Sequence, residues 1–168
     1  MLVPTPPVTA PSARPGRAVP APAAPLAPPP GRRLACWAMK AVTSGVPRVR
    51  ASMRHALGGW GVAPERIEVL LLVATELLSN AVRHAGGRAA DRVCVTVALH
   101  GGRLWLEVAD GDPCLPCVGP NVDPEVGMDA ESGRGLLIVN FLVGEAGGRL
   151  MVVRAEFGKV VRVRIPCA

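Results

Sequence analysis

One long helix is the feature that most constrains how this chain folds. Between Pro64 and His84, apolar residues recur at three- and four-residue steps, the spacing that places side chains on one face of an α-helix. Pro64 suits the first helical turn, where its missing N–H costs nothing, and Gly86-Gly87 follows the last turn. We therefore predict a helix over 64–84 with one face buried against a core.

Strands that alternate apolar and polar residues follow this helix and supply a surface for it to cover. Residues 93–99 and 104–108 alternate in this way and are joined at Gly101-Gly102, which predicts a hairpin that ends at Asp110. Two more strands are expected over 149–156 and 159–165, with a turn between them.

The remaining elements complete an α+β pattern. They are an edge strand over 34–42, a helix from Pro47 to about Gly58, a loop over 111–132, and a helix from Arg134 to about Val143. Helices in the first half followed by antiparallel strands predict a two-layer sandwich, with helices on one face of a mixed, largely antiparallel sheet.

The first 33 residues differ in composition from the rest of the chain. They hold 11 of the 18 prolines and four arginines but no acidic residue and no aromatic residue. Such a stretch has little to bury, so we expect a disordered Pro/Ala-rich tail over 1–33 and one domain over 34–168. The net charge of +6 falls to +2 once the four tail arginines are subtracted, and aromatic residues are scarce. Both observations argue against direct binding of nucleic acid.

Location and membrane association follow from hydropathy and cysteine usage. Prolines interrupt every apolar stretch of the tail, and the apolar run 69–74 is much shorter than a bilayer requires. Five cysteines without an export signal favour reduced thiols. We expect a cytoplasmic protein that does not contact a membrane.

Three polar side chains lie along one side of the long helix. Glu76, Asn80 and His84 are spaced by four residues among apolar neighbours. Polar groups in such surroundings need partners or a cleft, and a carboxylate beside an amide oxygen suits a hard cation and a general base. The alternative is a solvated stripe of the helix.

Two later segments have the chemistry of a nucleotide site. Asp110 ends a strand, where its carboxylate can accept a hydrogen bond from an exocyclic amine, although Asp and Gly are also common turn residues. Gly133-Arg134-Gly135 precedes the last expected helix, where glycines permit close approach and helix N–H groups favour phosphate.

In combination, these segments resemble a known family. Residues 76–84, which read ELLSNAVRH, look like the N box of the Bergerat-type ATPases, the group that includes gyrase, histidine kinases and MutL. Asp110 resembles the first glycine box, and Gly133-Arg134-Gly135-Leu136 the second. The wording of these boxes is most similar to the anti-sigma factor serine/threonine kinases of the RsbW and SpoIIAB type.

The resemblance implies ATP and Mg²⁺ as cofactors. It makes Asn80 the metal ligand, Asp110 the partner of the adenine amine, and Glu76 the catalytic base. We also expect the nucleotide to be bound by Arg83, His84, Asp112, Gly133, Arg134, Gly135 and Leu136. The family's Asp-x-Gly run has Asp112 in place of its glycine here, and Gly158-Lys159-Val160 stands where relatives have Gly-Lys-Thr.

The function implied is ATP-dependent phosphorylation of an anti-anti-sigma factor of the STAS type, combined with sequestration of a sigma factor. The alternative is an ATP-binding switch without phosphotransfer. A homodimer is a further possibility that the sequence leaves open. Cys114 and Cys117 form a CxxC pair, either a metal or redox site or incidental thiols in the loop.

Overall fold

The computed structural model describes residues 31–84, 92–115, 131–156 and 158–167; for 131–134 it describes the backbone alone. The helices are α1 (Val46–Gly59), α2 (Pro64–His84) and α3 (Glu131–Glu145), with a short 3₁₀ turn at Thr43–Gly45. The strands are β1 (Arg33–Lys40), β2 (Arg92–His100), β3 (Arg103–Asp110), β4 (Arg149–Ala155) and β5 (Gly158–Pro166).

The five strands form one sheet in the order β1-β2-β3-β5-β4. Each neighbouring pair is antiparallel, so the described sheet is antiparallel throughout, in line with the predicted mixed but largely antiparallel sheet. Hairpins connect β2 to β3 and β4 to β5, and short connections of this kind join antiparallel strands. The register places Asp110 of β3 opposite Lys159 of β5.

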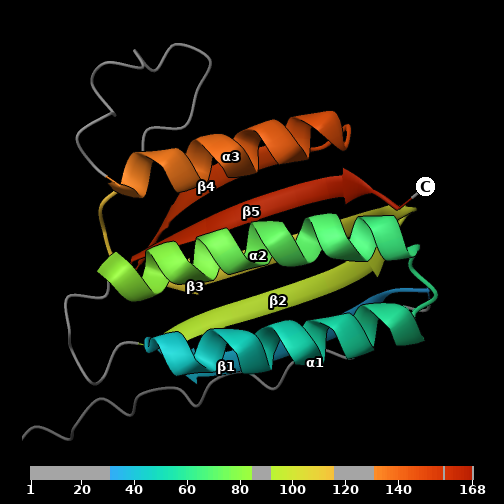
Figure 1. Ribbon diagram of the computed structural model, residues 1–168, viewed down its shortest axis with the longest axis horizontal. Coiled ribbons are helices and arrows are strands. Elements are labelled where there is room, and N and C mark those ends of the chain that lie inside the picture. Colours follow the sequence, from blue (N-terminus) through green and yellow to red (C-terminus); the bar gives the residue numbers. More distant parts are fainter. Residues whose placement is uncertain (1–30, 85–91, 116–130, 157, 168) are drawn as a thin grey trace, which may run out of the picture.

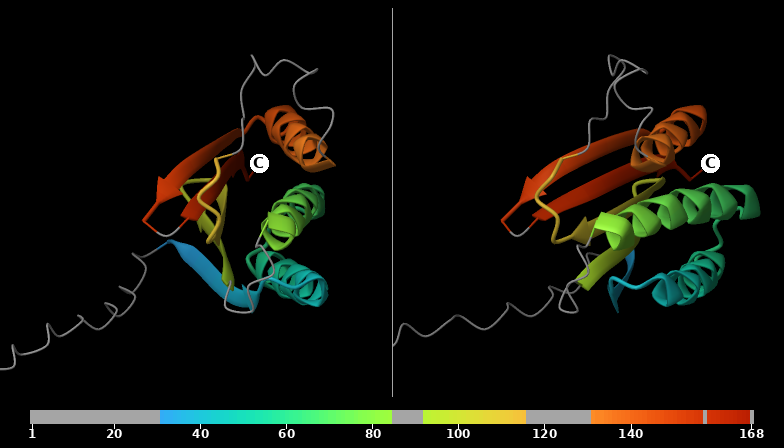
Figure 2. Two further views of the ribbon diagram at one scale, coloured as in Figure 1. Left: turned by 90° about the vertical axis from the view of Figure 1, so that its left-hand side faces the viewer. Right: turned by 60° about the vertical axis from the view of Figure 1, so that its left-hand side comes forward.

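All three helices cover the same face of the sheet, which confirms the predicted two-layer α+β sandwich (Figures 1 and 2). α2 lies in the middle of the helical layer, between α1 and α3 (Figure 1). The core fills the space between the layers. Its fully buried side chains include Met53, Leu57, Leu70, Leu71, Leu78, Leu104, Leu106 and Ile165.

α2 is buried more deeply than a surface helix because it contacts the sheet below and a helix on each side. Eight of its residues are buried, at the three- and four-residue steps expected from the sequence: Ile67, Leu70, Leu71, Val73, Ala74, Leu77, Leu78 and Ala81. Of the helices that the structure describes, none has the length and apolarity needed to cross a bilayer.

α3 differs from the prediction at its start. The helix begins at Glu131 rather than at Arg134, so Gly133 and Gly135 lie inside its first turns and not in a turn that precedes it. Glycine costs about 1 kcal/mol in a helix relative to alanine, and the sequence pattern therefore favoured a later start. Gly135 is buried against α2, and that packing explains why a helix tolerates it.

Candidate functional site

The site lies where α2 ends, β3 ends and α3 begins, at one end of the molecule (left in Figure 1). Glu76 and Asn80 are one helical turn apart on the side of α2 that faces α3, and both side chains are half-buried. A Cβ at Gly135 would lie 3.1 Å from Oε2 of Glu76 and 3.3 Å from Nδ2 of Asn80. The structure therefore brings the predicted N-box residues together with the second glycine of the later segment.

Asn80 has unused hydrogen-bonding capacity. Within the described residues, its Nδ2 is buried and has no hydrogen-bond partner. From the described residues its Oδ1 accepts one long bond, 3.5 Å, from Nη1 of Arg83. A buried amide nitrogen without a hydrogen-bond partner lowers the stability of the fold, and such groups are typical of sites that bind a ligand. Nδ2 can therefore donate a hydrogen bond to a phosphate oxygen, and Oδ1 is the atom of Asn80 that could face a metal ion.

Asp110 lies on the sheet side of the site, at the end of β3, and forms an ion pair with Lys159. The Asp110 residue is 9% exposed and Lys159 is 7% exposed. The lysine Nζ lies 3.2 Å from Oδ1 of Asp110, and that same oxygen accepts a 3.0 Å bond from the backbone N–H of Asp112. Within the described residues, both contacts of the Asp110 carboxylate use Oδ1, so Oδ2 is available to accept a hydrogen bond from an exocyclic amine.

Asp112 belongs to the same cluster. Oδ2 of Asp112 lies 2.6 Å from Nζ of Lys159, and the same Nζ donates to the backbone oxygen of Asp112 at 3.4 Å. Oδ1 of Asp112 accepts from the backbone N–H of Cys114 at 3.0 Å. The hydrogen bond from Lys159 holds the pKa of the Asp112 carboxyl below its usual range, although partial burial opposes this, and the Cys114 N–H adds to the lowering. We call Asp110, Asp112 and Lys159 the carboxylate clamp.

Gly158 lets the clamp form. Its φ of 117° is open to glycine, and a Cβ there would collide with the backbone oxygen of Asp110 and with Gly111. Lys159 can thus reach the loop after β3 only because the chain passes Asp110 without a side chain. Sequence reasoning missed Lys159. The run Gly158-Lys159-Val160 was the available signal, but its comparison with Gly-Lys-Thr drew attention to Val160 instead.

The structure places the other expected residues as follows. Arg83 and His84 are exposed at the end of α2. Leu136 is half-buried and packs against the core. Gly133 and Arg134 are helical, and the side chain of Arg134 lies outside the described residues. Val160 alternates with buried Val161, so it faces away from the helices. Cys114 is exposed, whereas Cys117 lies outside the described residues.

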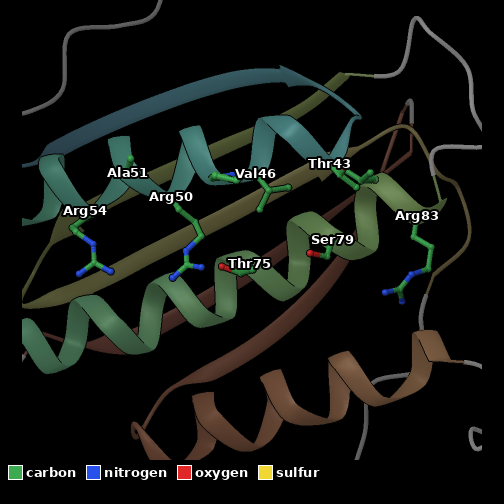
Figure 3. Close-up of a pocket in the computed structure, with 10 residues that line it drawn as sticks. Thr43, Val46, Arg50, Ala51, Arg54, Thr75, Ser79 and Arg83 are labelled. Atoms are coloured by element: carbon green, nitrogen blue, oxygen red, sulfur yellow. The ribbon is translucent and has the colours of Figure 1, made fainter.

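A separate groove lies on the opposite side of α2, between α1 and α2 (Figure 3). Its volume is about 770 Å³, and Arg50 and Arg54 of α1 point across it toward α2, Arg50 in the direction of Thr75 (Figure 3). Arg54 is already paired with Glu68. The groove contains neither Glu76 nor Asn80. We therefore assign the nucleotide site to the polar groups between α2, α3 and β3. Residues 116–130, most of the expected loop between β3 and α3, lie outside the described residues.

Comparisons with known proteins agree with this arrangement. Residues 39–165 match the family described as histidine kinase-like ATPase domain. A comparison with curated protein sequences finds no match.

Two solved structures have a similar fold. One contains the RsbU and RsbW domains of Rv1364c from Mycobacterium tuberculosis, with 19% identity and a TM-score of 0.58 over 80% of this chain. The other is the blue-light activated histidine kinase EL346 from Erythrobacter litoralis, with 30% identity and a TM-score of 0.51 over 63% of this chain. The chain covers only 32% of the length of each. With the family match spanning most of its length, this chain belongs to the histidine kinase-like ATPase domain family.

Proposed function

We propose that the chain is an ATP-dependent protein serine/threonine kinase that phosphorylates an anti-anti-sigma partner of the STAS type and sequesters a sigma factor. One observation carries the nucleotide-binding part: Glu76 and Asn80 meet Gly135, and the amide nitrogen of Asn80 has no hydrogen-bond partner among the described residues. Membership of the ATPase domain family supports ATP as the nucleotide.

Each residue of the site has a role in this proposal. Asn80 would hold Mg²⁺ through its amide oxygen, and Oδ2 of Asp110 would accept a hydrogen bond from the adenine amine. Gly135, which has no side chain, leaves room between α3 and α2. Bound Mg²⁺ would neutralise charge on the phosphates. Asp112 acts indirectly, because its carboxylate is already used by Lys159 and Cys114.

Glu76 is the proposed general base. It is half-buried on the same face of α2 as Asn80, one turn away, so it lies beside the phosphates if Asn80 binds their metal ion. Its carboxylate would take the proton of a serine hydroxyl while the serine oxygen bonds to the γ-phosphorus and the bond to the leaving ADP oxygen breaks.

The assignment of the partner has a separate basis. It comes from the resemblance of residues 76–84 to the anti-sigma kinases, together with a fold shared with a protein that includes an RsbW domain. If the partner is a sigma factor, the protein acts in the cytoplasm, where the transcription machinery is found.

The test is phosphate transfer from γ-labelled ATP to a purified STAS protein in the presence of Mg²⁺. Glu76→Gln should abolish transfer and keep ATP binding, while Glu145→Gln, an exposed acid at the end of α3, should leave both unchanged. Transfer that survives in Glu76→Gln would rule out Glu76 as the base.

The second candidate is an ATP-dependent switch without phosphotransfer. Its support is the carboxylate clamp. Asp112 stands where the family has a glycine, and its ion pair with Lys159 fixes the loop after β3. The Glu76→Ala variant separates the two functions. A kinase loses turnover but still binds ATP, whereas a switch keeps its ATP-dependent response to the partner.

A further inference from the structure

The face of the sheet that the helices leave uncovered has an uneven distribution of charge. All three helices lie on the opposite face (Figure 2), and the side chains that alternate with the core residues point away from them. These outward positions hold one acidic residue, Glu107, and six basic residues: Lys40, Arg92, Arg103, Arg149, Arg162 and Arg164. We call this surface the outer face.

The charge is most concentrated on β4 and β5. Arg149 lies directly opposite Arg164, and like charges in directly opposed positions are destabilising. Arg162 follows two residues away on the same face, and its Nε lies 2.9 Å from Oε1 of Glu107. Within the described part of the chain, no carboxylate forms an ion pair with Arg149 or Arg164. Two arginines thus share a site that no carboxylate of the described residues neutralises.

Neighbouring side chains give this site the composition of a protein interface. The guanidinium of Arg164 lies 5.5 Å from the ring centroid of Trp105, which restricts both side chains. Met151, opposite Arg162, is 57% exposed. Tryptophan, arginine and methionine are enriched at protein–protein interfaces, and ordered arginines contribute strongly to binding.

We propose that the outer face around Arg149, Arg162 and Arg164 binds an acidic segment of another protein. An extended segment fits best, because side chains two residues apart on a strand recur at about 6.8 Å, the spacing from Arg162 to Arg164. Alternate carboxylates on such a segment would each meet a guanidinium, the geometry in which arginine binds carboxylate most strongly.

Two other occupants fit less well. A second copy of this chain would place arginines against arginines, because symmetric partners present the same surface. Single-stranded nucleic acid needs aromatic rings to stack its bases, whereas among the described residues of this face the aromatic side chain is Trp105, with Arg164 over it. The proposal is independent of the nucleotide site, since the outer face is on the other side of the sheet (Figure 2).

The test uses a fluorescent peptide of about twelve residues in which Glu alternates with Thr, long enough to extend along a strand. Anisotropy is measured at low salt with the full chain and with Arg149→Glu/Arg164→Glu. A matched variant, Arg48→Glu/Arg50→Glu, makes the same change in net charge on α1. We expect the first variant to lose about ten-fold or more in affinity and the second to bind as the wild type does.

Three results would overturn the proposal. The first is an equal loss in both variants, or a loss in neither. The second is tighter binding of an oligothymidylate than of the acidic peptide at the same salt. The third is a wild-type dimer that dissociates when Arg149 and Arg164 are reversed, which would identify the outer face as a self-interface. Arg149→Gln/Arg164→Gln serves as a second variant and should lose binding without introducing new carboxylates.

Discussion

Lys159→Met removes the cation of the carboxylate clamp and tests whether the clamp holds the site together. The ammonium lies 3.2 Å from Asp110 and 2.6 Å from Asp112, and the lysine is 7% exposed. Methionine matches the length of the lysine stem but carries no charge. The variant would leave two poorly hydrated carboxylates next to each other with no counter-ion.

The expected cost follows from what each carboxylate keeps. Breaking a buried pair by removing one partner costs about 3–5 kcal/mol. Asp110 still accepts from the N–H of Asp112, and Asp112 still accepts from that of Cys114, so the lower end of the range applies. We expect Lys159→Met to lower the free energy of unfolding by about 3 kcal/mol.

Urea denaturation measures this cost, and Arg162→Met is its matched control. Arg162 is also a cation of β5 paired with a carboxylate, at 2.9 Å, but its side chain is 45% exposed. Exposed pairs contribute about 0–1 kcal/mol, so the control should change stability little. Asp112→Leu combined with Lys159→Met should cost less than the sum of the single changes, by about 1 kcal/mol or more, because one of the two stranded carboxylates is gone. Equal losses in Lys159→Met and Arg162→Met would refute the reasoning.

Two further outcomes follow from the same contacts. Gly135→Ala should change stability by no more than about 1 kcal/mol, since alanine favours the helix. The added Cβ would press on Glu76 and Asn80, so a calorimetric titration should show weaker ATP binding than in the wild type. Unchanged ATP affinity would contradict the packing at this point. The lowered pKa of Asp112 contributes stability that is present above the unfolded pKa of about 3.9 and is lost as pH falls through the folded value. The free energies of unfolding of wild type and Asp112→Asn, measured in urea, should therefore converge at acid pH. A difference that does not shrink on acidification would refute the link.

The fold could be predicted from the sequence because its elements have strong and different periods. α2 was identified from apolar steps of three and four residues, and the β2–β3 hairpin from alternation around two glycines. The predicted start of α3 was three residues too late, because its glycines disfavour a helix locally. The packing of Gly135 on α2 offsets that cost. Tertiary contacts of this kind are not visible in a local pattern.

The site was predictable where the residues lie on one element. Glu76 and Asn80 share a helix face, so their proximity follows from helix geometry alone. The carboxylate clamp was not predictable, because Lys159 reaches Asp110 and Asp112 through the pairing of β3 with β5, across more than forty residues of chain. Asp112 was expected to contact the nucleotide, which stays a prediction; its hydrogen bonds to Cys114 and Lys159 position the loop after β3.

Magnesium-dependent binding of ATP to wild type and Asn80→Ala, measured by calorimetry, tests the central claim most directly. Asn140→Ala, an exposed asparagine of α3, is the control. We expect Asn80→Ala to bind ATP about ten-fold or more weakly in Mg²⁺, a difference that shrinks when EDTA removes the metal, while Asn140→Ala binds as the wild type does. Equal affinity of wild type and Asn80→Ala in Mg²⁺ would contradict the assignment of this site.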